Sequence, residues 1–352
     1  MRRHGSRWFL AGGVIACVLP LLAGAADPLS LEGAGGGEPP GPRRPDVFRV
    51  WGGAGYMTVR DEWRTSFNEA IVPGLVGSAL VRGESKLEYK GRDGVPWELG
   101  AAWRPLSLPS GALELRVKYT GFDLSGGTDQ DSDTAFVRTG GATASETFSV
   151  SESDLKSQGS MWSVECGWIL PPARGLAGMR IAPFAGYARW HDELETANLR
   201  QIVSPVGEEP ASLPGVKDAS YELTWELLEG GVDVTVPLAR ALDFTARAAM
   251  LVCVDYHADA VWYLRPDLAQ NPSFDHESRG GLGADLSAGL AGSLFAGPSW
   301  QVGWEAGVFY QQVESRQGAD TTYFADGDIA RTGLDYVRRS STGVHGRLVL
   351  GF

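Results

Sequence analysis

The sequence predicts an all-β protein, a ten-stranded antiparallel up-and-down transmembrane β-barrel with short periplasmic turns and long outer loops. Three observations favour this fold class. Apolar and polar residues alternate along many segments, the links between these segments are alternately short and long, and the chain ends within such a segment at Phe352. Successive side chains of a strand point to opposite faces, so each segment has one apolar and one polar face.

The N-terminus has the layout of a secretory signal peptide, which we assign to residues 1–26. A basic start precedes an apolar run from Trp8 to Leu22, and small residues close the run. A membrane anchor helix and lipoprotein processing at Cys17 are the alternatives. Residues 27–45 are rich in Gly and Pro and are expected to form a flexible segment, so the barrel is predicted over residues 46–352.

Ten strands are expected, counted from Val47. The first, residues 47–60, and the fifth, residues 179–191, alternate less regularly than the rest. The sixth, residues 221–236, changes phase near Leu227, which predicts a β-bulge or a bend. The other strands alternate regularly and cover residues 97–103, 112–120, 162–170, 242–257, 282–290, 300–310 and 341–352.

The links between these strands differ in length in a regular way. Links after the second, fourth, sixth and eighth strands are short, whereas links after the odd-numbered strands are long and polar. This pattern is typical of an outer-membrane barrel, whose closed ring satisfies every backbone hydrogen-bonding group inside lipid. An even number of strands places both termini on the periplasmic side. A soluble β-sandwich is the alternative, but it does not explain the pattern of links.

The two faces of the strands imply two environments. Apolar side chains face lipid, with Trp and Tyr forming girdles at the interfaces, and charged side chains face a narrow lumen. A lumen filled by charges that pair with one another disfavours a diffusion pore and places function on the outer loops. The inward candidates are Glu98, Arg104, Glu114, Arg116, Lys118, Glu165, Asp233, Asp243, Arg247, Asp285, Glu305, His345 and Arg347.

Composition and motifs exclude several classes of function. The net charge is -12 and no long basic run occurs, so nucleic acid is not an expected partner. The sequence holds no CxxC, HExxH or GxSxG motif, no phosphate-binding loop and no cluster with metal-ligand spacing, so we expect no cofactor and no metal. After removal of the signal, Cys166 and Cys253 remain, either as two buried free thiols or as one disulfide.

Several segments resemble the omptins, a family of ten-stranded outer-membrane proteases. The stretch SKLEYKGRDGVPWELGAAWRPL resembles an omptin second strand, and YTGFDLSGGTDQDSD resembles the loop after the third strand. The chain is similar, and closer, to the omptin-like outer-membrane proteins of environmental chlamydiae and relatives, which SKLEY and DSD suit. The resemblance implies a Gram-negative cell outer membrane, lipopolysaccharide as a lipid partner, and an assembly machinery that reads the last strand, ending in Phe352.

The omptin resemblance also implies a catalytic site. Omptin chemistry is thought to hold a water molecule between an Asp pair and a His–Asp pair, with the His as base. Asp129 and Asp131 match the first pair. Asp255 and His257 are the candidates for the second pair and are expected to face the lumen, although the family places its pair further along, near residues 258–263, where no His occurs.

Three functions stay open. The first is a non-enzymatic surface, structural or adhesion role of the outer loops, with an extracellular ligand that the sequence does not name. The alternative is an omptin-type aspartyl endopeptidase that uses the four residues just named, and a second alternative is a narrow channel or transporter. The ordinary explanation is that the acidic stretch is a solvated loop tip and that His257 pairs with Arg247 in the lumen. His276, beside Asp275, is a further, imperfect candidate for the base.

Overall fold

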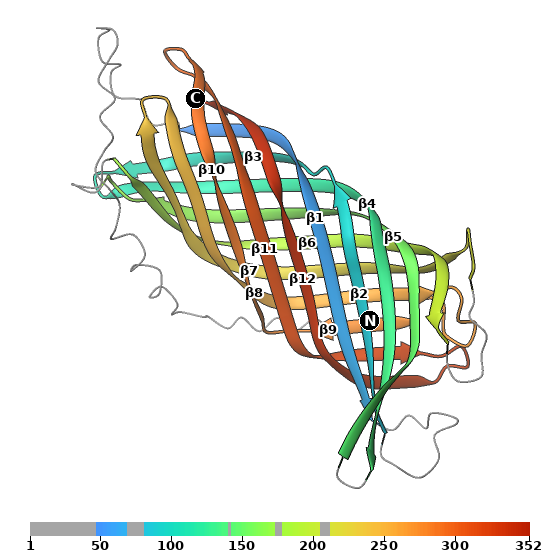
Figure 1. Cartoon of the computed structure of the whole chain (residues 1–352). Helices are drawn as coiled ribbons and strands as arrows, with labels where there is room; N and C mark the ends of the chain where they lie inside the picture. Colours follow the sequence, from blue (N-terminus) through green and yellow to red (C-terminus); the bar gives the residue numbers. More distant parts are fainter. Residues whose placement is uncertain (1–46, 69–80, 140–141, 173–177, 205–211) are drawn as a thin grey trace. The chain divides into compact units, whose positions relative to one another are not determined.

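The computed structural model of the chain describes residues 47–68, 81–139, 142–172, 178–204 and 212–352 (Figure 1). The predicted signal peptide and the segment 27–45 lie outside the described residues. No helix in the described part is long and apolar enough to cross a membrane. The described strands are β1 (Phe48–Asn68), β2 (Val81–Gly94), β3 (Trp97–Leu108), β4 (Gly111–Thr139), β5 (Ala142–Ile169), β6 (Arg180–Val203), β7 (Lys217–Ala239), β8 (Leu242–Trp262), β9 (Phe274–Ser278), β10 (Gly281–Ala296), β11 (Gln301–Tyr323) and β12 (Ile329–Gly351).

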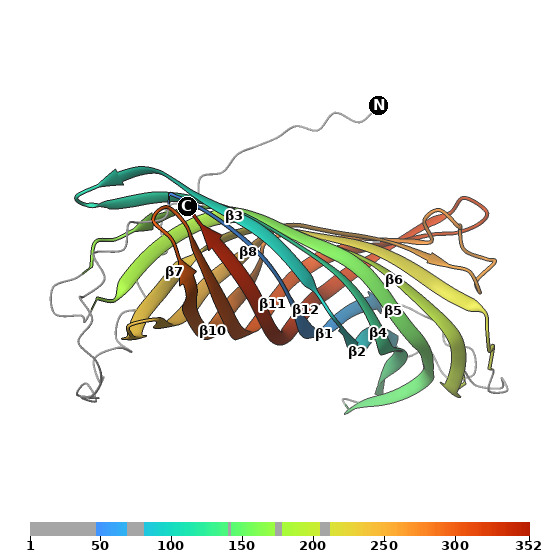
Figure 2. The ribbon, with the colours of Figure 1, turned by 90° about the horizontal axis from the view of Figure 1, so that it is seen from above.

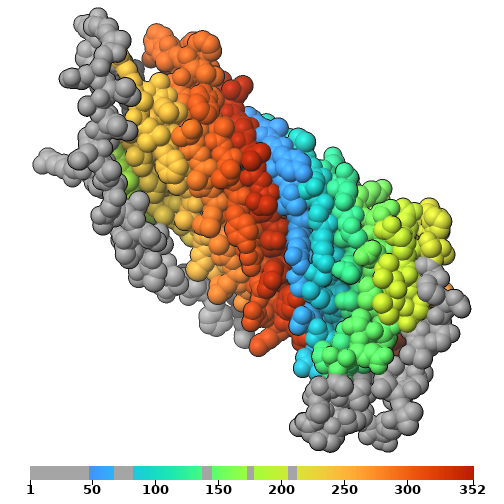
Figure 3. All heavy atoms as spheres, in the orientation of Figure 1, coloured from blue at the N-terminus to red at the C-terminus, as the bar shows by residue number. Residues whose placement is uncertain are grey.

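These strands form a closed antiparallel ring with ten positions (Figure 1, Figure 2). β3 continues β2 after a break at Val95 and Pro96, and both strands pair with β1 and β4. β10 continues β9 in the same way between β8 and β11. β12 pairs with β1 and closes the ring, and these two strands lie side by side in Figure 3, red against blue. The predicted ten-stranded barrel is confirmed.

The short links lie together at one end of the barrel, which we call the short-turn end. They join β3 to β4, β5 to β6, β7 to β8 and β10 to β11. The two ends of the described chain meet here, because Val47 N donates to Phe352 O and Phe352 N donates to Phe48 O, both at 2.8 Å. The opposite end, where the other links lie, is called the long-loop end.

The strands reach further towards the long-loop end than predicted. β4 and β5 have 29 and 28 residues, because polar residues continue the alternation beyond the apolar stretch. The acidic stretch of residues 119–133, which was expected to resemble the loop after the third strand, is therefore part of β4, and that prediction was wrong. The extension matters for function because it holds the acidic side chains on a regular sheet.

A band of exposed apolar side chains surrounds the barrel towards the short-turn end and defines its membrane-spanning segments. Beyond Tyr119 on β4 and Tyr310 on β11 the outward residues become polar. Cys166 is exposed on this wall, Cys253 is buried in the interior, and both are free thiols. Exposed members of the band include Tyr56 on β1, Trp97 and Leu99 on β3, Val117 and Tyr119 on β4, Leu286 and Leu290 on β10, Val308 and Tyr310 on β11, and Leu348 on β12. The apolar stripes that were predicted to face lipid do lie on the outer side of the barrel.

A bulge in β4 decides which acidic residues point into the barrel. The pairing of β4 with β5 shifts between Leu124 and Gly127. Gly126 has a φ of +73° at this point, a backbone conformation that glycine adopts without strain. The extra residue exchanges the two faces of the strand, so the odd-numbered residues beyond it point inward.

Candidate functional site

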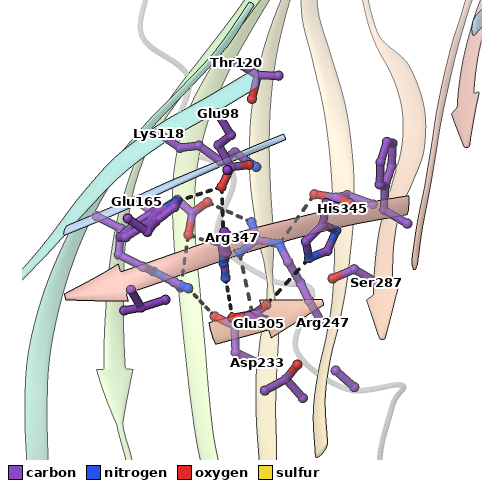
Figure 4. A pocket seen from close by; sticks show the side chains of 18 of the residues that line it. Glu98, Lys118, Thr120, Glu165, Asp233, Arg247, Ser287, Glu305, His345 and Arg347 are labelled. Carbon is purple, nitrogen blue, oxygen red and sulfur yellow. Dashed lines mark hydrogen bonds and ion pairs between the residues drawn. The ribbon is translucent and has the colours of Figure 1, made fainter. Parts of the chain in front are cut away.

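The lumen near the short-turn end holds a cavity of about 310 Å³ lined by charges of both signs (Figure 4). Arg247 forms ion pairs with Glu165 at 2.9 Å and with Asp285 at 3.4 Å. Arg347 contacts Glu305 at 2.8 Å from the neighbouring strand. The predicted pairing of lumen charges is therefore confirmed, and the pairs leave a polar cavity rather than an apolar pocket.

Four buried charges cross the lumen on the long-loop side of the cavity. Asp61, Arg92, Asp192 and Arg339, from β1, β2, β6 and β12, are each at most 1% exposed. Arg92 hydrogen-bonds Asp61 and lies 3.6 Å from Asp192. Arg339 hydrogen-bonds Asp192 and lies 3.5 Å from Asp61. We call this group the four-charge layer. Buried charges persist only when they are paired, so its members depend on one another.

The next layer towards the long-loop end is aromatic and aliphatic. The rings of Trp63, Tyr89 and Tyr221 meet edge to face, with centroids 4.7 to 5.5 Å apart. Trp225 packs on Tyr256 with a centroid distance of 4.5 Å. These rings belong to a buried cluster built from β1, β2, β5, β6, β7, β8, β11 and β12, which we call the aromatic layer. Together with the four-charge layer it occupies the lumen between the cavity and the long-loop end.

The structure places Asp129 and Asp131 inside the barrel at the long-loop end. Because of the bulge at Gly126, they point inward together with Asp133, and Asp129 lies directly across the strand pair from the buried Tyr89. All three lie beyond the apolar band. Burial raises the pKa of both Asp129 and Asp131, and the neighbouring carboxylates raise it further, that of Asp131 to about 8.

These carboxyls lack the cations that accompany the other inward acidic groups. Among the residues that the structure describes, no basic side chain forms an ion pair with Asp129, Asp131, Asp133 or Asp218, and Arg265 interacts electrostatically with Asp133 alone. Asp218, on β7, is 6% exposed, and its carboxyl lies beside the Ser153 side chain and the Leu199 backbone, whereas Oδ1 of Asp129 is buried without a hydrogen-bond partner. The charge of Asp218 also raises the pKa of Asp129, so the two belong to one group. Sequence analysis missed Asp218, because no alternation precedes it at the start of its strand.

Asp255 and His257 do not join this group. Leu227 lies opposite Cys253, and the preceding residue of β7, Glu226, lies opposite Asp255, so Val254 is an extra residue in β8. The bulge exchanges the faces of β8, and the side chains of Asp255 and His257 point out of the barrel, 43% and 42% exposed. Their expected lumen orientation was therefore wrong. The phase change predicted near Leu227 was also wrong, because β7 keeps its alternation there, with Leu227 and Glu229 buried and Leu228 exposed, and the extra residue lies on β8.

The inward positions of β8 at the long-loop end carry no acid–base group. They are Ala258 and Ala260, each 1% exposed, within the region where the omptin resemblance implies a catalytic pair. Neither alanine can accept a proton from water. The structure therefore brings together the acidic half of the predicted catalytic site without the Asp–His half.

One inward histidine does lie on the neighbouring strand β9. His276 Nδ1 accepts a hydrogen bond from Trp63 Nε1 at 2.8 Å, and its Nε2 lies 3.3 Å from Asp320. Indole nitrogen only donates, so Nδ1 is the unprotonated nitrogen of this imidazole. Because this nitrogen already accepts the hydrogen bond from Trp63, it is not free to take a proton from water. The rings of Trp63 and Tyr89 pack against each other between His276 and the position of Asp129.

On the outer wall, the pairing of β8 with β9 gathers side chains that sequence spacing does not connect. His257, Asp275 and Glu277 each offer a metal-ligating atom, and these atoms lie within 4.8 Å of one another. His257 lies directly opposite Glu277 in the strand pair. The expectation of no metal cluster rested on spacing along the chain, which does not register neighbours across two strands.

Comparisons with known proteins agree with this architecture. Residues 111–352 match the family described as Pom: Protochlamydia outer membrane protein. A comparison with curated proteins found no match. The outer membrane protease OmpT from Escherichia coli is similar in structure, at 12% identity and a TM-score of 0.58, over 88% of this chain and 97% of that chain. The transport unit of the autotransporter AIDA-I from Escherichia coli matches at 10% identity and a TM-score of 0.26, over 89% and 92%. The likeness to OmpT shows an omptin-like barrel fold.

Proposed function

Since the chain belongs to the family of Protochlamydia outer membrane proteins, we propose that it is a non-enzymatic outer-membrane barrel whose long-loop end binds cationic groups at the cell surface, in a structural or adhesion role. Its termini and short turns then lie on the periplasmic side. The observation that carries the proposal is the group of inward carboxyls, Asp129, Asp131, Asp133 and Asp218, in which only Asp133 interacts with a cation of the described chain, Arg265.

Burial and neighbouring negative charge destabilise the ionised form of these carboxyls, which raises their pKa values. A cation placed among them favours their ionised form and gains charge-assisted hydrogen bonds. Tyr89 and Tyr221 border the same space, and aromatic faces also attract cations. Lysine or arginine side chains of a surface partner fit this chemistry.

The absence of a base at the predicted position supports the non-enzymatic reading. Ala258 and Ala260 line the wall of β8 at the long-loop end, and Nδ1 of His276 is engaged by Trp63. An omptin-type endopeptidase remains the second candidate function, because raised pKa values at Asp129 and Asp131 are also typical of catalytic carboxyls.

The interior layers argue against a channel. A path for ions must pass the four-charge layer, whose members are at most 1% exposed, and then the aromatic layer, where Trp63, Tyr89 and Trp225 are at most 1% exposed. Paired charges and packed rings across the lumen oppose a continuous aqueous route past the described residues.

The test uses the refolded full-length barrel with lipopolysaccharide present. Binding and cleavage of a fluorescent lysine- and arginine-rich peptide are measured for wild type, for Asp129→Asn/Asp131→Asn and for Asp255→Asn, which removes an outward carboxylate as the matched control. We expect binding without cleavage, at least about tenfold weaker binding in the double variant, and no change in the control. An acidic peptide of equal length should not bind.

Two results would overturn the proposal. Cleavage by wild type that the double variant loses would make the chain a peptidase built on the Asp pair. Equal binding by wild type and the double variant would show that the cation partner lies elsewhere. Altered gel mobility before boiling confirms that each variant is folded.

A further inference from the structure

The outer wall of β8 and β9 carries a compact patch of ligand-type side chains beyond the apolar band. The register places His257 opposite Glu277 and Asp259 opposite Asp275. Directly opposed residues of an antiparallel pair hold their Cβ atoms about 4.5 to 5.5 Å apart, so all four side chains share one small area. The ligating atoms of His257, Asp275 and Glu277 lie within 4.8 Å of one another, which allows a single ion to contact all three.

The imidazole of His257 already has the orientation that a metal site requires. Its Nδ1 lies 3.4 Å from Asp275 Oδ1, and its Nε2 lies 3.1 Å from Asp259 Oδ2. Metal-bound histidines commonly direct one nitrogen to the ion and donate the other N–H to a carboxylate that fixes the ring. Here Asp259 takes the orienting place, and Nδ1 faces the other two carboxylates.

In the described part of the chain, no lysine or arginine forms an ion pair with the carboxylates of the patch itself. Asp259 and Asp275 oppose each other directly, and like charges in that position destabilise a strand pair. The nearby Arg279 donates from Nε to Asp255 at 2.9 Å and interacts electrostatically with Glu277, but it forms no ion pair with Asp259 or Asp275. Oδ1 of Asp275 is buried and makes no hydrogen bond in the described residues, with Nδ1 of His257 3.4 Å away.

We propose that His257, Asp275 and Glu277 bind a divalent first-row transition metal ion such as Zn²⁺ on the outer wall of the barrel, with Asp259 orienting the imidazole. One nitrogen and two or three carboxylate oxygens suit Zn²⁺ better than Ca²⁺ or Mg²⁺, which prefer all-oxygen sites. The ion would join β8 to the short strand β9 and neutralise their opposed carboxylates. This site is separate from the proposed cation-binding group inside the barrel, since its side chains point the other way.

The experiment is calorimetric titration of the refolded full-length barrel with ZnCl₂, with CaCl₂ as a second titrant. His257→Ala and Glu277→Gln are compared with His191→Ala. His191 is the matched control, since it also points outward beyond the band on β6, 3.7 Å from Glu193 and 3.9 Å from Glu222. Gel mobility before boiling shows that each variant is folded.

We expect one zinc ion per barrel, bound at least about tenfold more weakly by His257→Ala and by Glu277→Gln and unchanged in His191→Ala. Zinc binding should also weaken on acidification, because protons compete for the imidazole. Wild type that takes up no zinc, a His257→Ala variant that binds zinc as tightly as wild type, or calcium binding in preference to zinc would each overturn the proposal.

Discussion

Replacing Arg339 by Met should destabilise the barrel by about 3–5 kcal/mol, the cost of breaking a buried ion pair. Arg339 is 1% exposed and contacts both Asp61 and Asp192. Without it, two buried carboxylates share the single charge of Arg92. Methionine keeps most of the side-chain volume, so a cavity contributes little to the loss. The free energy of unfolding is measured by urea titration in detergent, with tryptophan fluorescence and gel mobility as two readouts.

Arg338→Met is the matched control. Arg338 is the preceding residue and points outward, where its side chain is 40% exposed and pairs with Glu314. A surface ion pair contributes about 0–1 kcal/mol, so the control should lose little stability. In Arg339→Met/Asp192→Asn, removal of one unpaired carboxylate should restore part of the loss, with a coupling of about 1–3 kcal/mol. Similar small losses in both single variants would refute the idea that the four-charge layer is a mutually dependent unit.

Three further outcomes follow from the layers and the lipid-facing wall. Trp63→Phe should cost about 2–4 kcal/mol in urea unfolding, since Nδ1 of the buried His276 loses its donor; no loss would contradict the assigned hydrogen bond. Asp131 has a pKa raised from 3.8 to about 8, so the folded state retains a proton that the unfolded state releases in that window; stability should fall as pH rises from 4 to 8, and Asp131→Asn should flatten this slope in unfolding titrations. Leu348→Lys, in the apolar band, should lower the free energy of unfolding by about 2–4 kcal/mol, whereas Gln312→Lys, beyond the band, should lower it by under about 0.5 kcal/mol. Equal losses in the two refolded variants would contradict the position of the band.

The barrel itself could be predicted because the alternation that identifies each strand lies within a short segment of the sequence. Alternation in segments such as residues 112–120 and 282–290 states which face is apolar, and ring closure follows from the requirement to pair every backbone group in lipid. The length of β4 and β5 could not be predicted in the same way. Beyond the band both faces of these strands are polar, so the pattern that identifies a strand in lipid fades while the strand continues.

The candidate site was predictable only in part, because bulges act on single residues. The resemblance led to Asp129 and Asp131, and the bulge at Gly126 turns both inward. The bulge at Val254 turns His257 outward. If the alternation of β8 is continued without this bulge, His257 is predicted to face the lumen. Gly126 is visible in the sequence as a residue suited to a bulge, but nothing in the residues around Val254 distinguishes it.

The seam between β1 and β12 bears on how the barrel is made. Val50 lies opposite Leu350, so this contact joins the first described strand to the last. A chain that is produced from its N-terminus exposes the unpaired edge of β1 until β12 arrives, and such distant pairing makes closure slow. We expect intermediates that lack this pairing to be open sheets with two free edges. Substitutions in the seam should therefore change the rate at which the ring shuts, and with it the time during which another chain could pair with the waiting edge.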